Sequence, residues 1–207
     1  METGVKTRIG ILGGTFNPVH LGHLILAQDA LEFFDLARVL FVPCAHPPHK
    51  AGVDLAPAEH RLAMLEAALE GDLRFEVGDL EIKRGGVSYT VDTVRELRAR
   101  YPDAELCLII GSDSLRELPA WHDVYALLEL CRVVTITRPG TEEALRAQGP
   151  ALEPPWPARL LCDLRTGHTV AISSSDIRHR VAEGLSIRYL VHPAVEIYIV
   201  EHGLYRK

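Results

Sequence analysis

Apolar and polar positions along the chain follow two alternating patterns. Short apolar runs that stop at a turn residue predict buried strands, and segments with apolar residues every three or four positions predict helices. Strands are expected at 8–12, 39–42, 75–77, 80–82, 106–110, 133–137, 160–161 and 169–172. Helices are expected at 21–34, 59–69, 89–100, 123–130 and 175–182, with a last one starting at Pro193.

Serines and prolines mark the boundaries of these elements. Ser88 and Ser174 are the expected N-caps of their helices, because a serine hydroxyl can accept a hydrogen bond from a free N–H of the first turn. Four prolines within 149–157 predict a loop rather than a linker.

The alternation of strands and helices predicts an α/β fold with a doubly wound parallel sheet. We expect one domain over residues 1–207, with a small C-terminal helical part from about 174 to 207 packed on it. In such sheets ligands bind at the carboxyl ends of the strands, so the loops that follow the strands are where function is expected.

Composition excludes several classes of protein. The chain has 207 residues, a formal net charge of −6 and no basic block, which disfavours nucleic acid as a partner. No apolar run approaches the length that spans a membrane. The four cysteines are far apart, without a CxxC pair, which predicts reduced thiols and a cytoplasmic location.

The loop after the first predicted strand carries the strongest chemical signal. It begins with Gly13-Gly14, which allow a ligand to approach the backbone, and it leads into a helix near His20. His20 and His23 are three residues apart and are expected on one side of the first turn, where free N–H groups favour a phosphate. Gly22 removes a side chain against which a nucleotide would otherwise collide.

Three other interpretations of this loop are weaker. The spacing is neither that of a dinucleotide-binding fingerprint, which needs a third glycine and a later acid, nor that of a P-loop. An ordinary strand–helix turn with two unremarkable histidines is the remaining alternative.

A second polar loop, residues 43–50, follows the second predicted strand. It is stiffened by prolines and ends at Lys50, a plausible arm for an acceptor phosphate. The pairs His20/His23 and His46/His49, with Cys44 nearby, leave a zinc site open as an alternative. A solvated loop without a role is the other one.

The third polar segment is 172–178, which passes from a predicted strand end into a helix. It holds the hydroxyls of Ser173, Ser174 and Ser175, and Arg178 comes one turn later. A simple N-cap explains one of these serines but neither the triplet nor the arginine, so a second anion cradle is predicted.

These motifs resemble those of a known family. His20-Leu21-Gly22-His23 is similar to the HxGH motif of the nucleotidyltransferases. The segments 13–23, 47–50, 88–92, 111–113, 118–121, 172–178 and 191–205 occur in the order found in bacterial nicotinate-nucleotide adenylyltransferases. The resemblance runs from Ile9 to Tyr205, with Ser175 in place of a usual threonine and His122 in place of a usual tyrosine.

The resemblance implies a Rossmann-like fold and the transfer of an adenylyl group from ATP to nicotinate mononucleotide, giving deamido-NAD and pyrophosphate. It implies Mg²⁺ carried by the ATP phosphates, without protein ligands of its own. Its catalytic residues would be His20, His23 and Arg178. Its ATP-binding residues would also include Gly13, Gly14, Thr15, Phe16, Gly22, Gly111, Asp113, Arg138, Ile172, Ser173, Ser174 and Ser175. Its acceptor-binding residues would be Asn17, His49, Lys50, Ser88, Tyr89, Thr90, Trp121 and His122.

Three rival functions stay open at this point. A phosphopantetheine adenylyltransferase shares HxGH but is usually shorter and leaves Trp121 and 88–90 unexplained. A non-catalytic nucleotide sensor on the same fold is disfavoured because both histidines are present. A redox enzyme that uses NAD lacks the glycine fingerprint. A homo-oligomer is compatible with the sequence.

Overall fold

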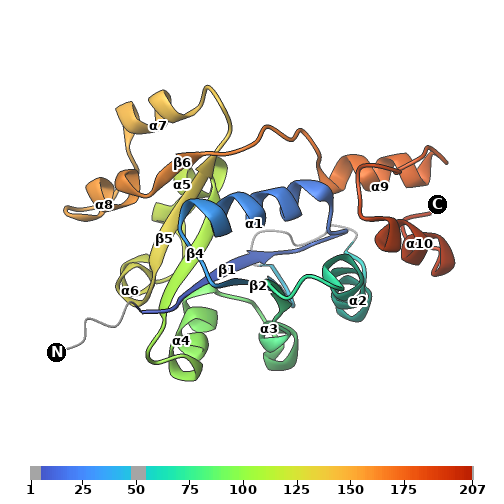
Figure 1. Cartoon of the computed structure of the whole chain (residues 1–207), viewed down its shortest axis with the longest axis horizontal. Coiled ribbons are helices and arrows are strands. Elements are labelled where there is room, and N and C mark those ends of the chain that lie inside the picture. The colour runs from blue at the N-terminus through green and yellow to red at the C-terminus, as the bar shows by residue number, and fades with distance from the viewer. Residues whose placement is uncertain (1–5, 48–54, 207) are drawn as a thin grey trace. The chain divides into compact units, whose positions relative to one another are not determined.

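The computed structural model describes residues 6–47 and 55–206 and contains a six-stranded sheet (Figure 1). The strand order is β3-β2-β1-β4-β5-β6. The strands are β1 (Arg8–Gly14), β2 (Arg38–Pro43), β3 (Phe75–Val77), β4 (Glu105–Gly111), β5 (Arg132–Thr137) and β6 (Leu164–Thr166). This is the order of a doubly wound α/β sheet, and the predicted fold class is confirmed.

The central strands of the sheet pair in parallel. Arg8 of β1 lies opposite Glu105 of β4, and Ile109 of β4 lies opposite Val134 of β5. β6 continues the pairing beside β5, as Figure 1 shows. β4 is buried along its apolar run because a parallel strand covered by helices has no solvent-facing side.

The helices connect the strands and extend beyond them. They are α1 (Leu21–Phe33), α2 (Ala58–Leu69), α3 (Leu80–Arg84), α4 (Thr90–Arg100), α5 (Ser112–Glu117), η1 (Leu118–Ala120), α6 (Val124–Leu130), α7 (Glu142–Gln148), α8 (Trp156–Cys162), α9 (Ser174–Ala182) and α10 (Pro193–Glu201). Pro193 is the first residue of its helix, as predicted, because a first-turn residue needs no N–H donor.

The chain forms two compact units. Unit 1 comprises residues 1–12, 26–40 and 89–169, and unit 2 comprises 13–25, 41–88 and 170–207. The core of unit 1 is built on β4 and β5, and the residues of β4 from Leu106 to Ile110 are at most 5% exposed. The single domain expected over 1–207 stays a prediction.

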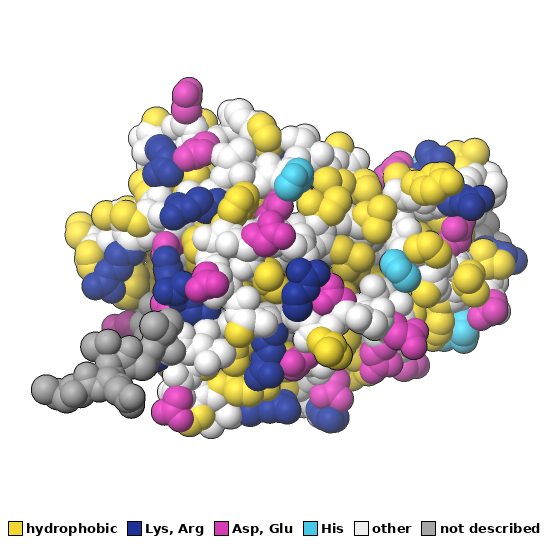
Figure 2. Space-filling model, viewed as in Figure 1, with side chains coloured by type: hydrophobic (Ala, Val, Ile, Leu, Met, Phe, Trp, Pro, Cys, Tyr) yellow, Lys and Arg dark blue, Asp and Glu magenta, His cyan; other side chains and the backbone are white. Residues whose placement is uncertain are grey.

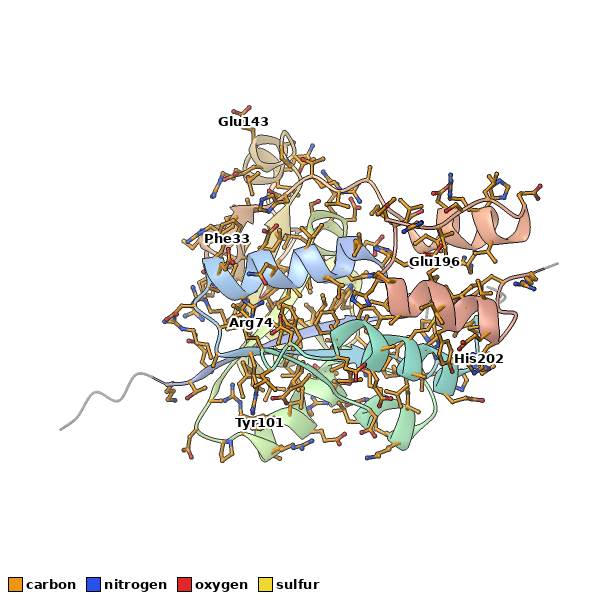
Figure 3. The ribbon with its side chains drawn as sticks, turned by 45° about the vertical axis from the view of Figure 1, so that its right-hand side comes forward. Phe33, Arg74, Tyr101, Glu143, Glu196 and His202 are labelled. Atoms are coloured by element: carbon orange, nitrogen blue, oxygen red, sulfur yellow. The ribbon has the colours of Figure 1, made fainter. Side chains whose placement is uncertain are left out.

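Unit 2 holds the two C-terminal helices. α10 packs against α2, and Figure 3 shows the two helices side by side with His202 just beyond the end of α10. The ring of Tyr198 stacks on that of His202 at 4.0 Å, and its hydroxyl lies 2.9 Å from Nδ1 of His60 on α2. These contacts fix α10 to the body of unit 2.

Several predicted elements differ from the structure. Residues 80–82 are helical within α3, 160–161 are helical within α8, and 169–172 form no strand. A short apolar run fits a strand and a helical turn equally well, so its pattern alone does not distinguish the two. β6 and α7 were not predicted.

Neither predicted serine is the N-cap of its helix. Tyr89, not Ser88, precedes α4, and the hydroxyl of Ser88 instead accepts a hydrogen bond from the N–H of Ala45. Ser173, not Ser174, caps α9 by accepting from the N–H of Asp176.

The surface carries mixed charge. On the face shown in Figure 2, lysine and arginine side chains lie among aspartates and glutamates. Within residues 6–47 and 55–206, the structure contains no helix with the length and apolar character needed to cross a membrane.

Candidate active site

The two HxGH histidines meet in unit 2 at the start of α1. Their rings are stacked with centroids 3.7 Å apart, so the prediction that they share one side of the first turn is confirmed. The main-chain N–H of His20 donates to Nδ1 of His23 over 3.2 Å. A ring nitrogen that accepts a hydrogen bond carries no proton, so Nδ1 of His23 is the acceptor nitrogen of its ring.

His20 is the more unusual of the pair. Its residue is 7% exposed, and burial lowers the pKa of its imidazole from 6.5 to about 4, so the ring is neutral at pH 7. Within the described part of the chain, its buried Nδ1 has no hydrogen-bond partner. A buried polar atom without a partner is costly, and a ligand that supplies one would bind favourably.

Glycines in this loop make room for side chains of the loop itself. A Cβ on Gly22 would lie 3.0 Å from the His20 ring, so the glycine makes room for that ring, and its contact with a nucleotide stays a prediction. A Cβ on Gly14 would lie 3.1 Å from the ring of Phe16. Phe16 is 1% exposed and its ring lies 5.0 Å from that of His23, so its side chain belongs to the core.

The start of α9 is joined to the loop after β1. The hydroxyl of Ser174 donates to the carbonyl of Pro18 over 2.9 Å, and Nη1 of Arg178 donates to the carbonyl of Asn17 over 2.8 Å. The hydroxyl of Ser175 lies 3.5 Å from Nη2 of Arg178. Two motifs 156 to 161 residues apart in sequence are therefore joined by hydrogen bonds, and anion binding at the start of α9 stays a prediction.

The first turn of α1 is less open than the sequence suggests. The N–H of Leu21 donates to the carbonyl of Leu190 over 3.0 Å, so this donor is not available to a phosphate. The remaining candidates for an anion are the histidine pair, the backbone of Gly13 and Gly14, and the start of α9.

Asn17 has a structural task that the sequence did not indicate. The residue is 2% exposed, and its Oδ1 accepts from the N–H of Ala56 over 3.1 Å and from the hydroxyl of Tyr205 over 2.8 Å. The carboxamide oxygen thus ties the C-terminus and the segment before α2 to the loop after β1. Acceptor binding by Asn17 stays a prediction.

The second polar loop is only partly described. His49 and Lys50, predicted on the acceptor side, lie outside the described residues. The segment leading to them is held by Ser88, whose N–H donates to the carbonyl of His46 over 3.0 Å. Among the described residues, no three His, Cys, Asp or Glu side chains are grouped as a metal site.

Sequence reasoning missed Arg61. Its guanidinium is 1% exposed and lies beneath the loops after β1 and β2, where it donates to four main-chain carbonyls. In the sequence it is one more polar position on a helix, and no spacing separates it from an exposed arginine.

Unit 1 brings two of the predicted acceptor residues, Tyr89 and His122, together. Tyr89 precedes α4, and its ring lies 4.2 Å from that of His122 at an interplanar angle of 31°. Trp121, the residue before His122, is half-buried at the end of η1. Thr90 is the first residue of α4, and the N-terminal end of a helix favours a negatively charged group such as a carboxylate.

The predicted adenosine residues follow two neighbouring strands of unit 1. Gly111 ends β4, and Asp113 lies on the first turn of α5 with its side chain 74% exposed and 3.2 Å from Arg116. Arg138 is exposed directly after β5. All three are at carboxyl ends of parallel strands, where ligands of such sheets bind.

The fold and these motifs define the class of protein. The profile of the cytidylyltransferase-like family matches residues 11–180, so the chain is a nucleotidyltransferase of that type.

Two relatives show which family of nucleotidyltransferases the chain belongs to. A protein of Thermomicrobium roseum named probable nicotinate-nucleotide adenylyltransferase is 46% identical over 203 residues, which cover 97% of this chain and 92% of the relative. A protein of Thermus thermophilus with the same name is 47% identical over 199 residues, which cover 96% of this chain and 100% of the relative. The chain belongs to the nicotinate-nucleotide adenylyltransferase family.

Solved structures share the fold at lower identity. The nicotinic acid mononucleotide adenylyltransferase of Plasmodium falciparum complexed with NaAD superposes with a TM-score of 0.73 at 20% identity, covering 96% of this chain and 97% of that one. The same protein complexed with APC gives a TM-score of 0.74 at 19% identity and the same coverage. The Rossmann-like fold implied by the motifs is therefore confirmed.

Proposed function

We propose that this enzyme transfers the adenylyl group of ATP to nicotinate mononucleotide, giving deamido-NAD and pyrophosphate. The family membership supports this reaction over the transfer to phosphopantetheine. The observation that carries it is the stacked His20/His23 pair, with an unpartnered buried nitrogen, at a helix start next to a second polar cradle.

In this reaction an oxygen of the acceptor phosphate attacks the α-phosphorus of ATP in line. A new P–O bond forms as the bond from the α-phosphorus to the bridging oxygen breaks, and pyrophosphate leaves with that oxygen. No enzyme nucleophile is required. The cysteines fit such a scheme, because burial raises the pKa of Cys107 and Cys131 to about 12 and keeps these thiols protonated.

Catalysis then comes from positioning and charge stabilisation. His20 and His23 would hold the ATP phosphates, and Arg178 with the start of α9 would stabilise the leaving pyrophosphate. Thr15 and the Gly13-Gly14 backbone would line the reacting phosphate. Magnesium would enter as MgATP, because this ion keeps several waters and prefers substrate phosphates to an all-protein cage.

Recognition of the rings would fall to residues of unit 1. The rings of Tyr89 and His122, with the neighbouring Trp121, offer flat faces for a pyridine ring. The N–H groups at the start of α4 suit the carboxylate of nicotinate. Asp113 and Arg138 would contact the adenosine. A homo-oligomer and a cytoplasmic location stay predictions.

The test is pyrophosphate release with ATP and Mg²⁺ in the presence of each candidate acceptor. We expect rapid release with nicotinate mononucleotide and none above background with 4′-phosphopantetheine. Binding of ATP without pyrophosphate release with either acceptor would instead favour a nucleotide sensor. For later substitutions of the histidine pair, the control is His179→Ala, because His179 is an exposed histidine of α9, and this variant should behave as wild type.

A further inference from the structure

The largest fully buried side chain of the described residues is a charged one. Arg61 lies in the first turn of α2 and is 1% exposed. Arginine is almost never fully buried unless its charge and donors are satisfied, because removing a guanidinium from water is costly. The hydrogen-bond partners of a buried arginine must therefore compensate for the cost of removing it from water.

All the partners of Arg61 among the described residues are main-chain carbonyls. Nε donates to the carbonyl of Ala56 over 3.0 Å. Nη1 donates to the carbonyls of Thr15 over 2.9 Å and Cys44 over 2.7 Å, and Nη2 donates to that of Ala45 over 3.3 Å. Four donors of one planar group are thus used on three separate segments of unit 2.

These segments are the ones that carry the predicted chemistry. Thr15 belongs to the nucleotide loop after β1, and Cys44-Ala45 follow β2. In the sequence, Lys50 lies between Ala45 and Ala56, so Arg61 is bonded to the chain on both sides of that residue. Ala56 is held a second time, through its N–H, by Asn17 of the nucleotide loop.

We propose that Arg61 is a positioning residue that aligns the acceptor with ATP. Its guanidinium sets the main-chain path of the nucleotide loop at Thr15 against the two ends of the segment that contains Lys50. This inference rests on the proposed function and extends it to a residue that touches neither substrate. A lysine cannot replace it, because an ammonium is a point charge with three donors and lacks the planar fork that reaches four acceptors.

The consequences for kinetics differ from those of lost stability alone. Three of the four bonds hold the acceptor segments and one holds the nucleotide loop. Loss of the fork should therefore raise the KM for nicotinate mononucleotide about tenfold or more and lower kcat by a similar factor, since misalignment costs rate steeply. The KM for ATP should change by less than about threefold.

The experiment compares Arg61→Lys and Arg61→Ala with the same changes at Arg98. Arg98 is a matched control because it also donates to two main-chain carbonyls, those of Ala104 over 2.6 Å and Leu130 over 2.7 Å, but serves no predicted substrate segment. Each variant is measured for Tm, for kcat and for both KM values, at a temperature well below its Tm.

We expect all four variants to lose Tm, and only the Arg61 pair to show the rise in acceptor KM and the fall in kcat. Millimolar guanidinium chloride should partly restore kcat in Arg61→Ala and do nothing for Arg98→Ala, with sodium chloride as the salt control. If Arg61→Ala does not fold, Arg61→Lys alone decides.

Wild-type values of kcat and KM in a folded Arg61→Lys would overturn the proposal and leave Arg61 a structural residue. An equal kinetic loss in the Arg98 variants would also overturn the proposal. Failure of the proposed function is distinguishable, because in that case the wild-type enzyme itself would not release pyrophosphate with nicotinate mononucleotide.

Discussion

The candidate site residues of unit 2 and those of unit 1 are built in opposite ways. In unit 2, Phe16, Asn17 and His20 are 1%, 2% and 7% exposed, and hydrogen bonds to distant segments hold the loop in which they lie. In unit 1, Asp113 and His122 are exposed. The loop after β1 is thus held in place by the fold, whereas these two residues of unit 1 are open to solvent.

The difference indicates a division of labour. Preorganised donors stabilise charge that develops in the transition state, so substitutions of the histidine pair in unit 2 should act mainly on kcat. Exposed rings and charges contact the ground state and transition state alike, so substitutions in unit 1 should act mainly on KM.

The largest effect is expected at His23. His23→Ala should lower kcat on the order of 10²–10³-fold, the size of losing one preorganised donor, with little change in Tm. Steady-state kinetics on the folded variant checks this, with His179→Ala as control. A kcat near that of wild type would remove the histidine pair from the mechanism.

His20 should give a pH-dependent stability. Burial lowers the pKa of its imidazole to about 4 from 6.5, so between these values the unfolded chain binds a proton that the folded chain does not. The stabilising contribution is present above pH 6.5 and is lost as pH falls, by about 3 kcal/mol once pH reaches about 4.

Urea unfolding of wild type and His20→Gln between pH 7 and pH 4 measures this term. The free energy of unfolding of the variant should fall less steeply over that range. Parallel curves for the two proteins would show that His20 is solvated and titrates normally.

Lys50 should act on the acceptor. Lys50→Ala is expected to raise the KM for nicotinate mononucleotide roughly tenfold, corresponding to about 1.4 kcal/mol, with a smaller effect on the KM for ATP. Lys83→Ala is the control, because Lys83 is an exposed lysine paired with Asp79. An equal rise in both KM values would assign Lys50 to the nucleotide instead.

Trp121 should give the smallest effect. Trp121→Ala is expected to raise the KM for the acceptor by about three- to tenfold, the size of one ring-stacking contact, and to leave kcat and the KM for ATP nearly unchanged. Trp156→Ala is the matched control, since Trp156 is the other tryptophan and is half-buried on α8. A large fall in kcat at Trp121 would contradict the division between the units.

Long patterned segments predicted the fold well. The runs of β1, β4 and β5 and the spacing of α1 and α2 are found within a residue or two of their expected bounds. β6 could not be found this way, because only Leu164 of its three residues is buried and it pairs with β5 alone. α7 buries a single residue, Leu145, so it too has no apolar stripe to detect.

The candidate site was predictable from motifs within one segment, and less so from contacts between distant segments. The spacing of His20 and His23 and the serines of α9 carry a local signal. The bonds of Asn17 to Ala56 and Tyr205, and the burial of Arg61, depend on segments far apart in sequence. No pattern within one segment encodes them.

The choice between nicotinate and nicotinamide mononucleotide as acceptor is the most direct test of the proposed carboxylate recognition. Nicotinate and nicotinamide mononucleotides differ by one carboxylate, and a site with donors for that group should reject the amide. We expect kcat/KM for nicotinate mononucleotide to exceed that for nicotinamide mononucleotide by roughly 10²–10⁴-fold, measured side by side with saturating MgATP. Equal values for the two acceptors would contradict the account of the rings of unit 1 and the start of α4 as a carboxylate-selective site.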